Sequence, residues 1–296
     1  MVTDQNFERV DPFLRWAGGK RWLRPTVNQI LGNRRISGYI EPFLGGASIF
    51  MGLAVAGRSV LADLNEELVG VYQAVRDSHV AVAEALEGYE NTPEAYYSAR
   101  ANVPRDLPSR AARFIYLNHT SFNGIHRVNL KGEYNVPFGY RKTVNMPSLA
   151  TLTFASQKLS KSTLCSGDFA VSLRDAKAGD LVFLDPPYTV AHNANGFVKY
   201  NQHLFSFSDQ QRLALEIERL LSLGADFILT NAAHASVADL FGPLGNQVVV
   251  SRKNAVGGRR ATRGRAEEFL FTNLDVSMLS GAPAPSNDPD EGSSPG

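Results

Sequence analysis

Cysteine is almost absent from this chain, which holds a single cysteine, Cys165, in 296 residues. One cysteine excludes an internal disulfide and is typical of a reducing compartment. No cluster of further cysteine and histidine residues surrounds it in the sequence, so we expect no metal site there. We predict that the Cys165 thiol fills a small space in the core.

Long apolar runs are also absent, because no run approaches the roughly 18 residues that a membrane-spanning helix requires. The first ten residues, MVTDQNFERV, lack the basic and then apolar pattern of a secretory signal. We therefore expect a cytoplasmic protein that does not associate with membranes. A chain of 296 residues suffices for one large domain, alone or with an insert.

A marked net charge is lacking as well, since 30 Lys and Arg residues stand against 29 Asp and Glu residues, +1 overall. Two segments nevertheless concentrate positive charge. The segment 100–150 holds eight basic residues against two acids, and the segment 252–265 holds six basic residues and no acid. Such clusters predict a polyanionic partner, for example a phosphate backbone. Three arginines of the second segment are the candidate phosphate contacts: Arg259, Arg260 and Arg263.

Short apolar runs bounded by turn residues predict four buried strands, at 37–43, 59–62, 181–184 and 227–230. Helical segments separate these runs. Strands that alternate with helices predict an α/β fold built on a doubly wound, mostly parallel sheet.

Two of the predicted helices have recognisable ends. The glycine pair at 45–46 is expected to open a helix that runs to Ala54. The segment 208–224, SDQQRLALEIERLLSLG, has Ser208 and Gln211 at the spacing of a capping box and Gly224 as its C-terminal stop.

The segment 77–149 breaks the alternation, because it is rich in Tyr, Arg, Asn and Pro and holds no buried-strand run. We predict that it forms an inserted domain outside the sheet, mainly helical in its first part and looped in its second. Residues 1–76 and 150–279 then form the main domain. Residues 280–296 are mostly Pro, Ser, Gly and Asp, and we expect them to be disordered.

Three polar signals follow predicted strands, where a doubly wound sheet binds its ligands. They are EPFLGGAS at 41–48, Asp63 and DPPY at 185–188. Asp63 lies 17 positions after Gly46, a spacing at which an acid meets the hydroxyls of a ribose. Because GxGxxG and a P-loop lysine are absent, a nucleoside without pyrophosphate fits better than a dinucleotide.

The DPPY tetrapeptide can hold a planar amine. The Asp185 carboxylate and the Pro186 carbonyl are two acceptors on a rigid backbone, so together they satisfy an exocyclic amine with two N–H donors. Tyr188 offers a flat face for the ring that bears the amine. Drawing both protons toward acceptors turns the nitrogen lone pair toward an electrophile, such as a methyl group on a sulfonium cofactor.

These motifs together resemble those of the Dam-type DNA adenine-N6 methyltransferases, which use S-adenosyl-L-methionine. FLRWAGGK at 13–20 resembles the family's N-terminal cofactor motif, and ADLN at 62–65 its ribose motif. EPFLGGAS resembles its glycine motif and DPPY its catalytic tetrapeptide, while YLNHTSFNGIHRVNLKGEYNVPFG at 116–139 resembles its target-recognition segment. The order is the family's, and the resemblance covers most of residues 12–275. It implies a Rossmann-like methyltransferase fold with a DNA-recognition insert at 77–149.

The resemblance also implies roles for individual residues. Lys20 is expected to face the methionine carboxylate, Asp63 the ribose, and Asp168 with Phe169 the cofactor adenine. The cofactor pocket would comprise Trp16, Lys20, Glu41, Pro42, Phe43, Gly45, Asp63, Asp168, Phe169 and Asp185. The target adenine would lie against the catalytic residues Asp185, Pro186, Pro187 and Tyr188.

Double-stranded DNA is the implied partner, and the protein is expected to be monomeric when free. Phe122 and Ile125 flank an Asn-Gly turn and could wedge into the duplex, while Arg127 could grip a guanine. Arg15 stands where family members carry a base-contacting lysine, which leaves the recognition site open between GATC and related sequences. The full set of implied DNA contacts in this region is Arg15, Phe122, Asn123, Ile125, Arg127, Lys131 and Pro137.

Two other readings stay open at the level of the sequence. The acceptor pair in DPPY would also suit an RNA base or a protein amide, against which stands the 116–139 segment. A catalytically idle DNA-binding protein on the same fold is the second alternative, and the presence of both Asp63 and Asp185 argues against it.

Overall fold

The computed structural model describes residues 11–129, 131–188, 205–253 and 265–279. Within them, seven strands form one sheet in the order β3-β2-β1-β4-β5-β7-β6. Strands β1 to β5 pair in parallel, whereas β7 pairs antiparallel with both β5 and β6. The strands span Ile36–Glu41 (β1), Val55–Asp63 (β2), Ser162–Ser166 (β3), Asp180–Leu184 (β4), Asp226–Ala232 (β5), Asn246–Lys253 (β6) and Arg265–Thr272 (β7). The predicted doubly wound, mostly parallel sheet is confirmed.

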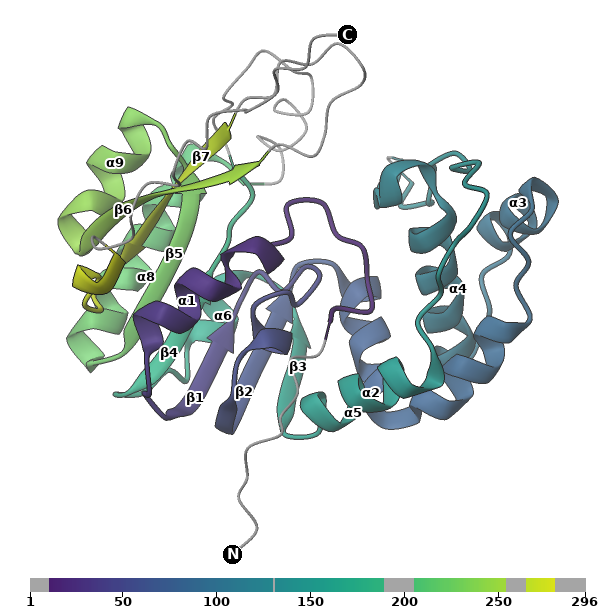
Figure 1. Cartoon of the computed structure of the whole chain (residues 1–296), viewed down its shortest axis with the longest axis horizontal. Helices are drawn as coiled ribbons and strands as arrows, with labels where there is room; N and C mark the ends of the chain where they lie inside the picture. The colour runs from purple at the N-terminus through teal and green to yellow at the C-terminus, as the bar shows by residue number, and fades with distance from the viewer. Residues whose placement is uncertain (1–10, 130, 189–204, 254–264, 280–296) are drawn as a thin grey trace, which may run out of the picture.

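Strand β4 is buried on both faces, as an unbroken apolar run predicts. Leu181 and Phe183 belong to one core cluster, and the alternate residues Val182 and Leu184 belong to the other. The sheet therefore lies between two helical layers (Figure 1). One core includes residues of α1 (Arg24–Leu31), α2 (Glu66–Glu87) and α5 (Leu149–Leu159). The other includes residues of α6 (Phe169–Leu173), α8 (Phe207–Leu223) and α9 (Ala235–Phe241).

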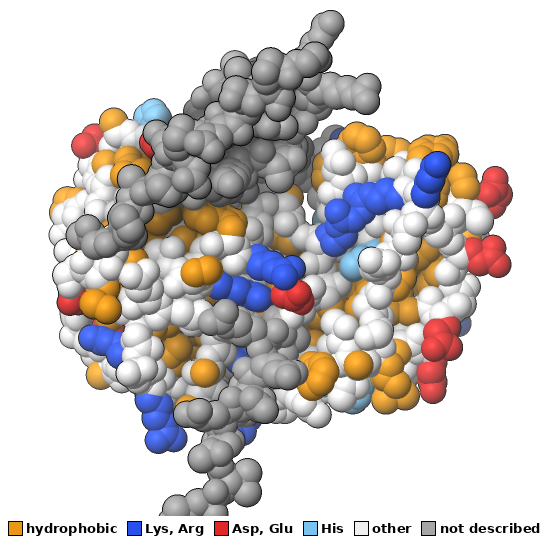
Figure 2. Space-filling view, in the orientation of Figure 1, with side chains coloured by type: hydrophobic (Ala, Val, Ile, Leu, Met, Phe, Trp, Pro, Cys, Tyr) orange, Lys and Arg blue, Asp and Glu red, His pale blue; other side chains and the backbone are white. Residues whose placement is uncertain are grey.

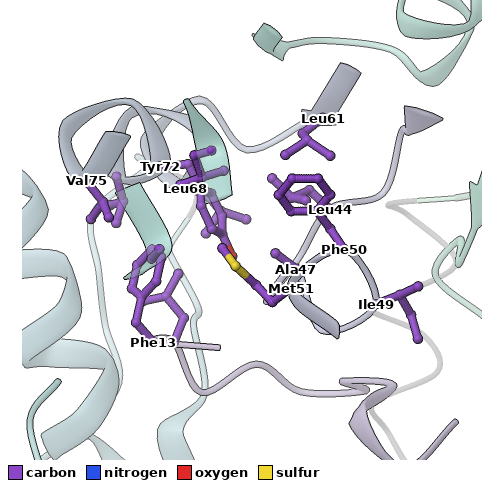
Figure 3. Close-up of a cluster of buried hydrophobic side chains, with 14 of the residues drawn as sticks. Phe13, Leu44, Ala47, Ile49, Phe50, Met51, Leu61, Leu68, Tyr72 and Val75 are labelled. Carbon is purple, nitrogen blue, oxygen red and sulfur yellow. The ribbon is translucent and has the colours of Figure 1, made fainter. Parts of the chain in front are cut away.

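The helix predicted from Gly45 to Ala54 is wrong. Gly45 and Ala47 have φ angles of 47° and 53°, in the left-handed region, so the chain cannot continue as a right-handed helix there. A short 3₁₀ turn, η2 (Phe50–Gly52), is the helical element of this segment. Figure 3 shows how its apolar residues are used instead, packed in the core beside residues of α2.

Helix α8 starts two residues earlier than predicted. Its N-cap is Ser206, whose hydroxyl accepts a hydrogen bond from the Asp209 backbone, while the Asp209 carboxylate accepts one from the Ser206 backbone. This closed capping box replaces the predicted pair of Ser208 and Gln211, because aspartate serves here as the reciprocal acceptor. Gly224 ends the helix in the left-handed conformation, as predicted.

The segment 77–149 contains helices and then irregular chain. Helix α2 continues into this segment as far as Glu87, with a break in helical geometry at Ser78. It is followed by α3 (Pro93–Ala101) and α4 (Leu107–Thr120). Helices α3 and α4 lie to one side of the sheet, at the right of Figure 1. Beyond α4 the described chain forms a 3₁₀ turn, η3 (Phe122–Gly124), and two isolated bridges. Because α2 spans the predicted boundary at 77, a division into two domains stays a prediction.

Two smaller expectations are refined. Arg113 in the basic segment 100–150 is buried, and its guanidinium donates to the carbonyls of Ala99 and Arg100, so this charge is structural. Cys165 is half-buried on β3.

No helix in the part of the chain that the structure describes is long and apolar enough to cross a bilayer. The predicted disordered tail at 280–296 lies outside the described residues.

Candidate functional site

A cavity of about 770 Å³ opens where the parallel strands end. Strands β1 and β2 end at Glu41 and Asp63, and Asp185 follows β4 directly. All the predicted cofactor and catalytic residues line this cavity: Trp16, Lys20, Glu41, Pro42, Phe43, Gly45, Asp63, Asp168, Phe169, Asp185, Pro186, Pro187 and Tyr188. The structure thus brings together residues that lie up to 172 positions apart (188 − 16).

The glycine turn makes room for an indole. A Cβ atom on Gly45 would lie 2.8 Å from Trp16 Cδ1, and one on Gly46 would lie 2.9 Å from Trp16 Cβ. Any larger residue at either position would displace Trp16, which lines the cavity. The EPFLGGAS motif therefore seats Trp16 against the end of β1.

Asp63 holds the same turn by hydrogen bonds. Its Oδ2 accepts from the Gly45 backbone at 2.9 Å, and its Oδ1 accepts from the Asn65 backbone at 2.9 Å. Burial raises the pKa of the Asp63 carboxyl, and these backbone bonds partly oppose the shift. Asp63 thus fixes the relative position of β2, the glycine turn and the start of α2.

The two oxygens of the Asp185 carboxylate differ in their partners. Its Oδ1 accepts a hydrogen bond from Thr230 Oγ1 at 2.8 Å and pairs with Lys20 Nζ at 2.9 Å. No described residue bonds its Oδ2. Burial raises the pKa of Asp185, while Lys20 and Thr230 lower it, so both partners favour the ionised form.

Lys20 lies at the centre of a buried polar group. Besides Asp185, its ammonium contacts the Gly18 carbonyl at 3.1 Å and Glu268 Oε2 at 3.5 Å, and it lies 4.9 Å from the centroid of the Tyr188 ring. Lys20 was expected to face a cofactor carboxylate. In this structure its carboxylate partners are Asp185 and Glu268.

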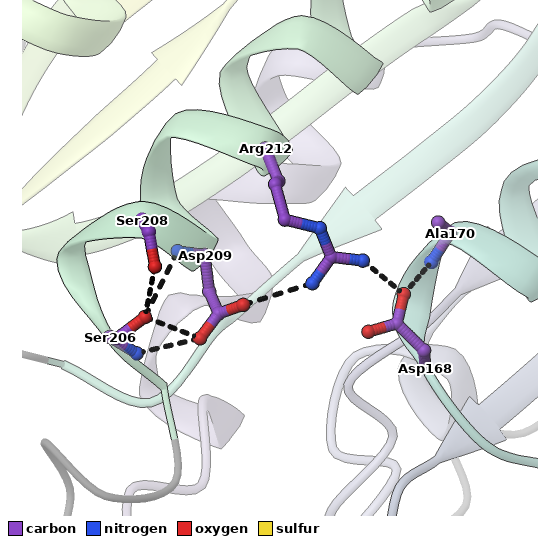
Figure 4. A network of polar contacts seen from close by, with 6 residues as sticks. All are labelled: Asp168, Ala170, Ser206, Ser208, Asp209 and Arg212. Atoms are coloured by element: carbon purple, nitrogen blue, oxygen red, sulfur yellow. Dashed lines mark hydrogen bonds and ion pairs between the residues drawn. The ribbon is translucent and has the colours of Figure 1, made fainter.

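A cluster of three aromatic rings forms another wall of the cavity. Phe43, Phe169 and Phe205 have ring centroids 5.5 to 5.8 Å apart. The guanidinium of Arg212 lies 4.9 Å from the Phe169 ring and also pairs with Asp168 at 2.9 Å. Figure 4 shows that Arg212 also pairs with the capping acid of α8, so the loop at Asp168 is tied to that helix.

The cavity wall is strongly acidic. Among the described residues that line it, one lysine, Lys20, faces six acids: Glu41, Asp63, Asp168, Asp185, Asp209 and Glu268. Burial raises the pKa of Glu41 to about 8, an effect that the Tyr39 hydroxyl partly offsets by donating to it at 2.8 Å. The charge of the cavity suits a cationic ligand rather than a phosphate.

The N-terminal motif and the predicted recognition segment are joined by one buried amide. Asn118 Oδ1 accepts from the Arg15 backbone N–H at 2.8 Å, and its Nδ2 donates to the Arg15 carbonyl at 2.6 Å and to the Gly124 carbonyl at 3.3 Å. Trp16 stacks on His126, with ring centroids 5.7 Å apart. The exposed Arg15 side chain is therefore held beside the 122–126 loop.

The predicted DNA contacts of this loop are on the surface. Phe122 is 52% exposed, Asn123 is exposed, and Ile125 is half-buried. The exposed Pro137 accepts a hydrogen bond from the Phe122 backbone at 2.9 Å. The 122–126 loop follows the C-terminal end of α4. Figure 2 shows a group of Lys and Arg side chains at the upper right of the molecule, on the same side as α4 in Figure 1.

The two predicted basic contacts of the following hairpin are also exposed. Arg127 donates from Nε to Asn135 Oδ1 at 2.7 Å, and the bridge between Val128 and Tyr134 closes the hairpin. Lys131 lies at its tip. The other three candidates, Arg259, Arg260 and Arg263, lie outside the described residues.

Comparison with known proteins assigns the chain to a family. The family model for D12 class N6 adenine-specific DNA methyltransferases matches residues 16–249. A type II methyltransferase of Lactococcus lactis subsp. cremoris, M1.LlaDCHI, is 32% identical over 284 residues, which cover 92% of this chain and 98% of that protein. The chain belongs to the D12 class of N6 adenine-specific DNA methyltransferases.

Other relatives of this D12-class enzyme have related names. The DNA adenine methylase of Escherichia coli strain K12 is 31% identical over 264 residues, covering 87% of this chain and 93% of that protein. The type II methyltransferase M.MjaIII of Methanocaldococcus jannaschii is 32% identical over 256 residues, covering 79% and 88%. The predicted family and enzymatic activity, methylation of adenine N6 in DNA, are confirmed.

Three polar residues of the D12-class site were missed in the sequence. Thr230 ends a buried apolar run, Glu268 directly precedes another in EEFLFT, and Asn118 is a lone amide on the buried face of α4. A polar side chain within or next to an apolar run is the signal that could have identified each of them, because burial requires a partner.

Proposed function

We propose that this D12-class methyltransferase transfers a methyl group from S-adenosyl-L-methionine to N6 of an adenine flipped out of double-stranded DNA, at GATC or a related site. The observation that carries the proposal is the state of Asp185. Its Oδ1 is fixed by Lys20 and Thr230, while Oδ2 has no described partner, and the residue lines the same cavity as Asp63 and Trp16.

The residues of the cavity fit the proposed cofactor. S-adenosyl-L-methionine carries a sulfonium and an ammonium group, and the residues that line the cavity include more acids than bases even with Glu41 protonated and with Arg212 paired to two of the acids. The aromatic rings of Phe43 and Phe169 suit its adenine, and Asp63 suits its ribose hydroxyls. When bound, the cofactor supplies an electrophilic methyl group.

The catalytic tetrapeptide supplies acceptors and a stacking face. Asp185 Oδ2 and the Pro186 carbonyl accept hydrogen bonds from the two N6–H groups of adenine, which leaves the nitrogen lone pair directed away from them. Tyr188 stacks on the base, an interaction that contributes roughly 1–3 kcal/mol. The two prolines, Pro186 and Pro187, fix the backbone that carries these groups.

Access to this cavity requires the target base to leave the duplex. N6 of a stacked adenine cannot reach a site at the bottom of a cavity, and flipping costs a few kcal/mol. Exposed Phe122 and half-buried Ile125 are suited to occupy the gap, because an apolar wedge offsets lost stacking.

Sequence choice is assigned to two arginines. Arg15 and Arg127 are exposed on adjoining parts of the surface. Asn135 holds the Arg127 guanidinium through Nε and Nη2, while Nη1 has no described partner. A guanine accepts hydrogen bonds from an arginine through O6 and N7 in the major groove. Asn123, Lys131 and Pro137 would support the same surface against the DNA backbone. The protein acts as a cytoplasmic monomer in this proposal.

A labelling experiment tests the proposed function. The protein is incubated with cofactor labelled in the methyl group and with duplex DNA containing GATC, a duplex of the same composition without GATC, single-stranded DNA, RNA or protein. The label is expected in N6-methyladenine of duplex DNA, most efficiently at GATC or a related sequence. Label in RNA or protein alone would support the alternative methyltransferase, and DNA binding without any label would support a catalytically idle protein.

A further inference from the structure

Glu268 is a buried carboxylate on β7, next to apolar residues of the core. It is 3% exposed on β7, and it is followed by half-buried Phe269 and by buried Leu270 and Phe271. Its neighbour Glu267 is exposed, as an acid on a strand normally is. Burying a carboxylate is costly unless it is paired and hydrogen-bonded, so the burial of Glu268 indicates that it has specific polar partners.

The partners of Glu268 lie in the catalytic cavity. Glu268 Oε2 accepts a hydrogen bond from the Tyr188 hydroxyl at 2.7 Å and lies 3.5 Å from Lys20 Nζ. A bond of this length to a carboxylate is of the charge-assisted kind, about twice as strong as a neutral one. The carboxylate also lines the cavity itself.

The support for Tyr188 comes from a strand distant in sequence. Tyr188 follows two prolines after β4, whereas Glu268 is paired with Ala232 across the antiparallel β5–β7 ladder. Strand β5 in turn lies between β4 and β7. The phenol oxygen is therefore anchored to the rigid sheet 80 residues away in the chain.

We propose that Glu268 is a positioning residue that fixes the plane of the Tyr188 ring so that it is ready to stack on the extruded adenine. The inference rests on the proposed function of Tyr188. A tyrosine ring without a partner for its hydroxyl rotates among several orientations, and stacking must then order it. Fixing the hydroxyl in advance removes that ordering cost before the base arrives.

The alternative to positioning is that Glu268 accepts a proton during the reaction. A Glu268→Gln variant distinguishes the two roles, because the glutamine side-chain carbonyl can accept the Tyr188 hydrogen bond but the amide cannot take up a proton. Positioning therefore predicts that Glu268→Gln is much less harmful than Glu268→Ala.

A double-mutant cycle tests the proposal. Glu268→Gln, Glu268→Ala, Tyr188→Phe and the combination of Glu268→Ala with Tyr188→Phe are compared with the wild type in single-turnover methylation of a duplex. Loss of a hydrogen bond to a charged group predicts a rate about tenfold lower for Glu268→Ala and for Tyr188→Phe. The combined variant is expected to be no slower than the slower single variant, and Glu268→Gln to lie within about threefold of the wild type.

A spectroscopic readout follows the ring directly. With 2-aminopurine at the target position, stacking on Tyr188 quenches the emission of the extruded base, so Glu268→Ala should leave it brighter than Glu268→Gln does. Thermal unfolding and cofactor binding of each variant identify loss of folding, and if Glu268→Ala does not fold, the Glu268→Gln and Tyr188→Phe cycle with the fluorescence measurement decides the matter.

Two results would overturn the inference: multiplicative rate losses in the combined variant, or a Glu268→Gln variant as slow as Glu268→Ala. Either result, obtained while the wild type methylates adenine, removes the positioning role alone. Failure of the wild type to methylate adenine removes the proposed function itself.

Discussion

Lys20 and Asp185 form a largely buried ion pair, with 2.9 Å between Nζ and Oδ1 and side chains only 5% and 20% exposed. The pair joins the first motif of the chain to the DPPY tetrapeptide at 185–188. Burial alone would raise the pKa of Asp185 and favour its neutral form, and the adjacent ammonium opposes this effect. An ionised Asp185 accepts a hydrogen bond from an amine N–H, whereas a protonated one would offer a competing donor.

Replacement of Lys20 tests this electrostatic role. In Lys20→Met the pKa of Asp185 rises further, so the acidic limb of the pH–rate profile should move to higher pH at saturating DNA and cofactor. Removing one partner of a buried pair should also lower the unfolding free energy by about 3 kcal/mol. The matched control is Lys161→Met, which removes an exposed lysine. An acidic limb that stays in place would show that Lys20 does not set the ionisation of Asp185.

Thr230 is expected to orient the same carboxylate without contacting the substrate. Thr230→Val preserves the shape of the side chain but removes the hydroxyl that donates to Asp185 Oδ1 at 2.8 Å. Loss of this bond should lower kcat about tenfold and leave the KM for the cofactor within twofold. Thr230→Ser keeps the hydroxyl and should restore most of the rate. Equal rates for the valine and serine variants would contradict the assignment.

Glu41 should make the stability of the protein depend on pH. Its pKa is raised from 4.5 to about 8 by burial, so the folded state keeps a proton that the unfolded state has lost in that range. The associated stability is fully present below pH 4.5 and is lost as pH rises toward 8, at about 1.4 kcal/mol per pH unit. Chemical denaturation of the wild type and Glu41→Gln between pH 5 and 9 measures the difference. Parallel stability curves for the two proteins would refute the shift.

Arg127 is expected to select sequence rather than to catalyse. Arg127→Ala should bring methylation of sites with one changed guanine closer to that of the preferred site, a loss of about 1–3 kcal/mol of discrimination, with the maximal rate retained. Arg105→Ala is the matched control, because this exposed arginine precedes α4 whereas the 122–126 loop follows it, at opposite ends of a helix about 21 Å long. Unchanged site preference in Arg127→Ala would exclude it as a reader.

Local patterns in the sequence predicted the strands and the acids at their ends, because both depend on neighbouring residues. The short apolar run before Asp185, closed by two prolines, predicted a buried strand, and an α/β sheet places the ends of its parallel strands along one edge. The left-handed turn at Gly45 and Ala47 was not predictable in the same way. Its conformation depends on Trp16, which packs against the two glycines from a distant part of the chain.

The polar network around Asp185 likewise combines residues that the local sequence identified with residues that it did not. Asp185 and Tyr188 belong to one recognisable tetrapeptide, but Thr230 and Glu268 come from strands 45 and 80 residues further on. Their roles follow from strand order, and the sequence does not reveal that β7 inserts antiparallel beside β5. Likewise, Asn118 meets Arg15 only because α4 packs beside the N-terminal motif, 103 residues away.

The chemistry of Asp185 is tested most directly by Asp185→Asn, which keeps the size of the side chain and replaces an acceptor by an amide donor. Single-turnover methyl transfer to a duplex is measured together with DNA and cofactor affinity in the same preparation. We predict a rate at least about a thousandfold lower than that of the wild type, as for the loss of a principal catalytic group, with DNA affinity within threefold. Methyl transfer at close to the wild-type rate would contradict the assignment of Asp185 as the acceptor that holds the adenine amine.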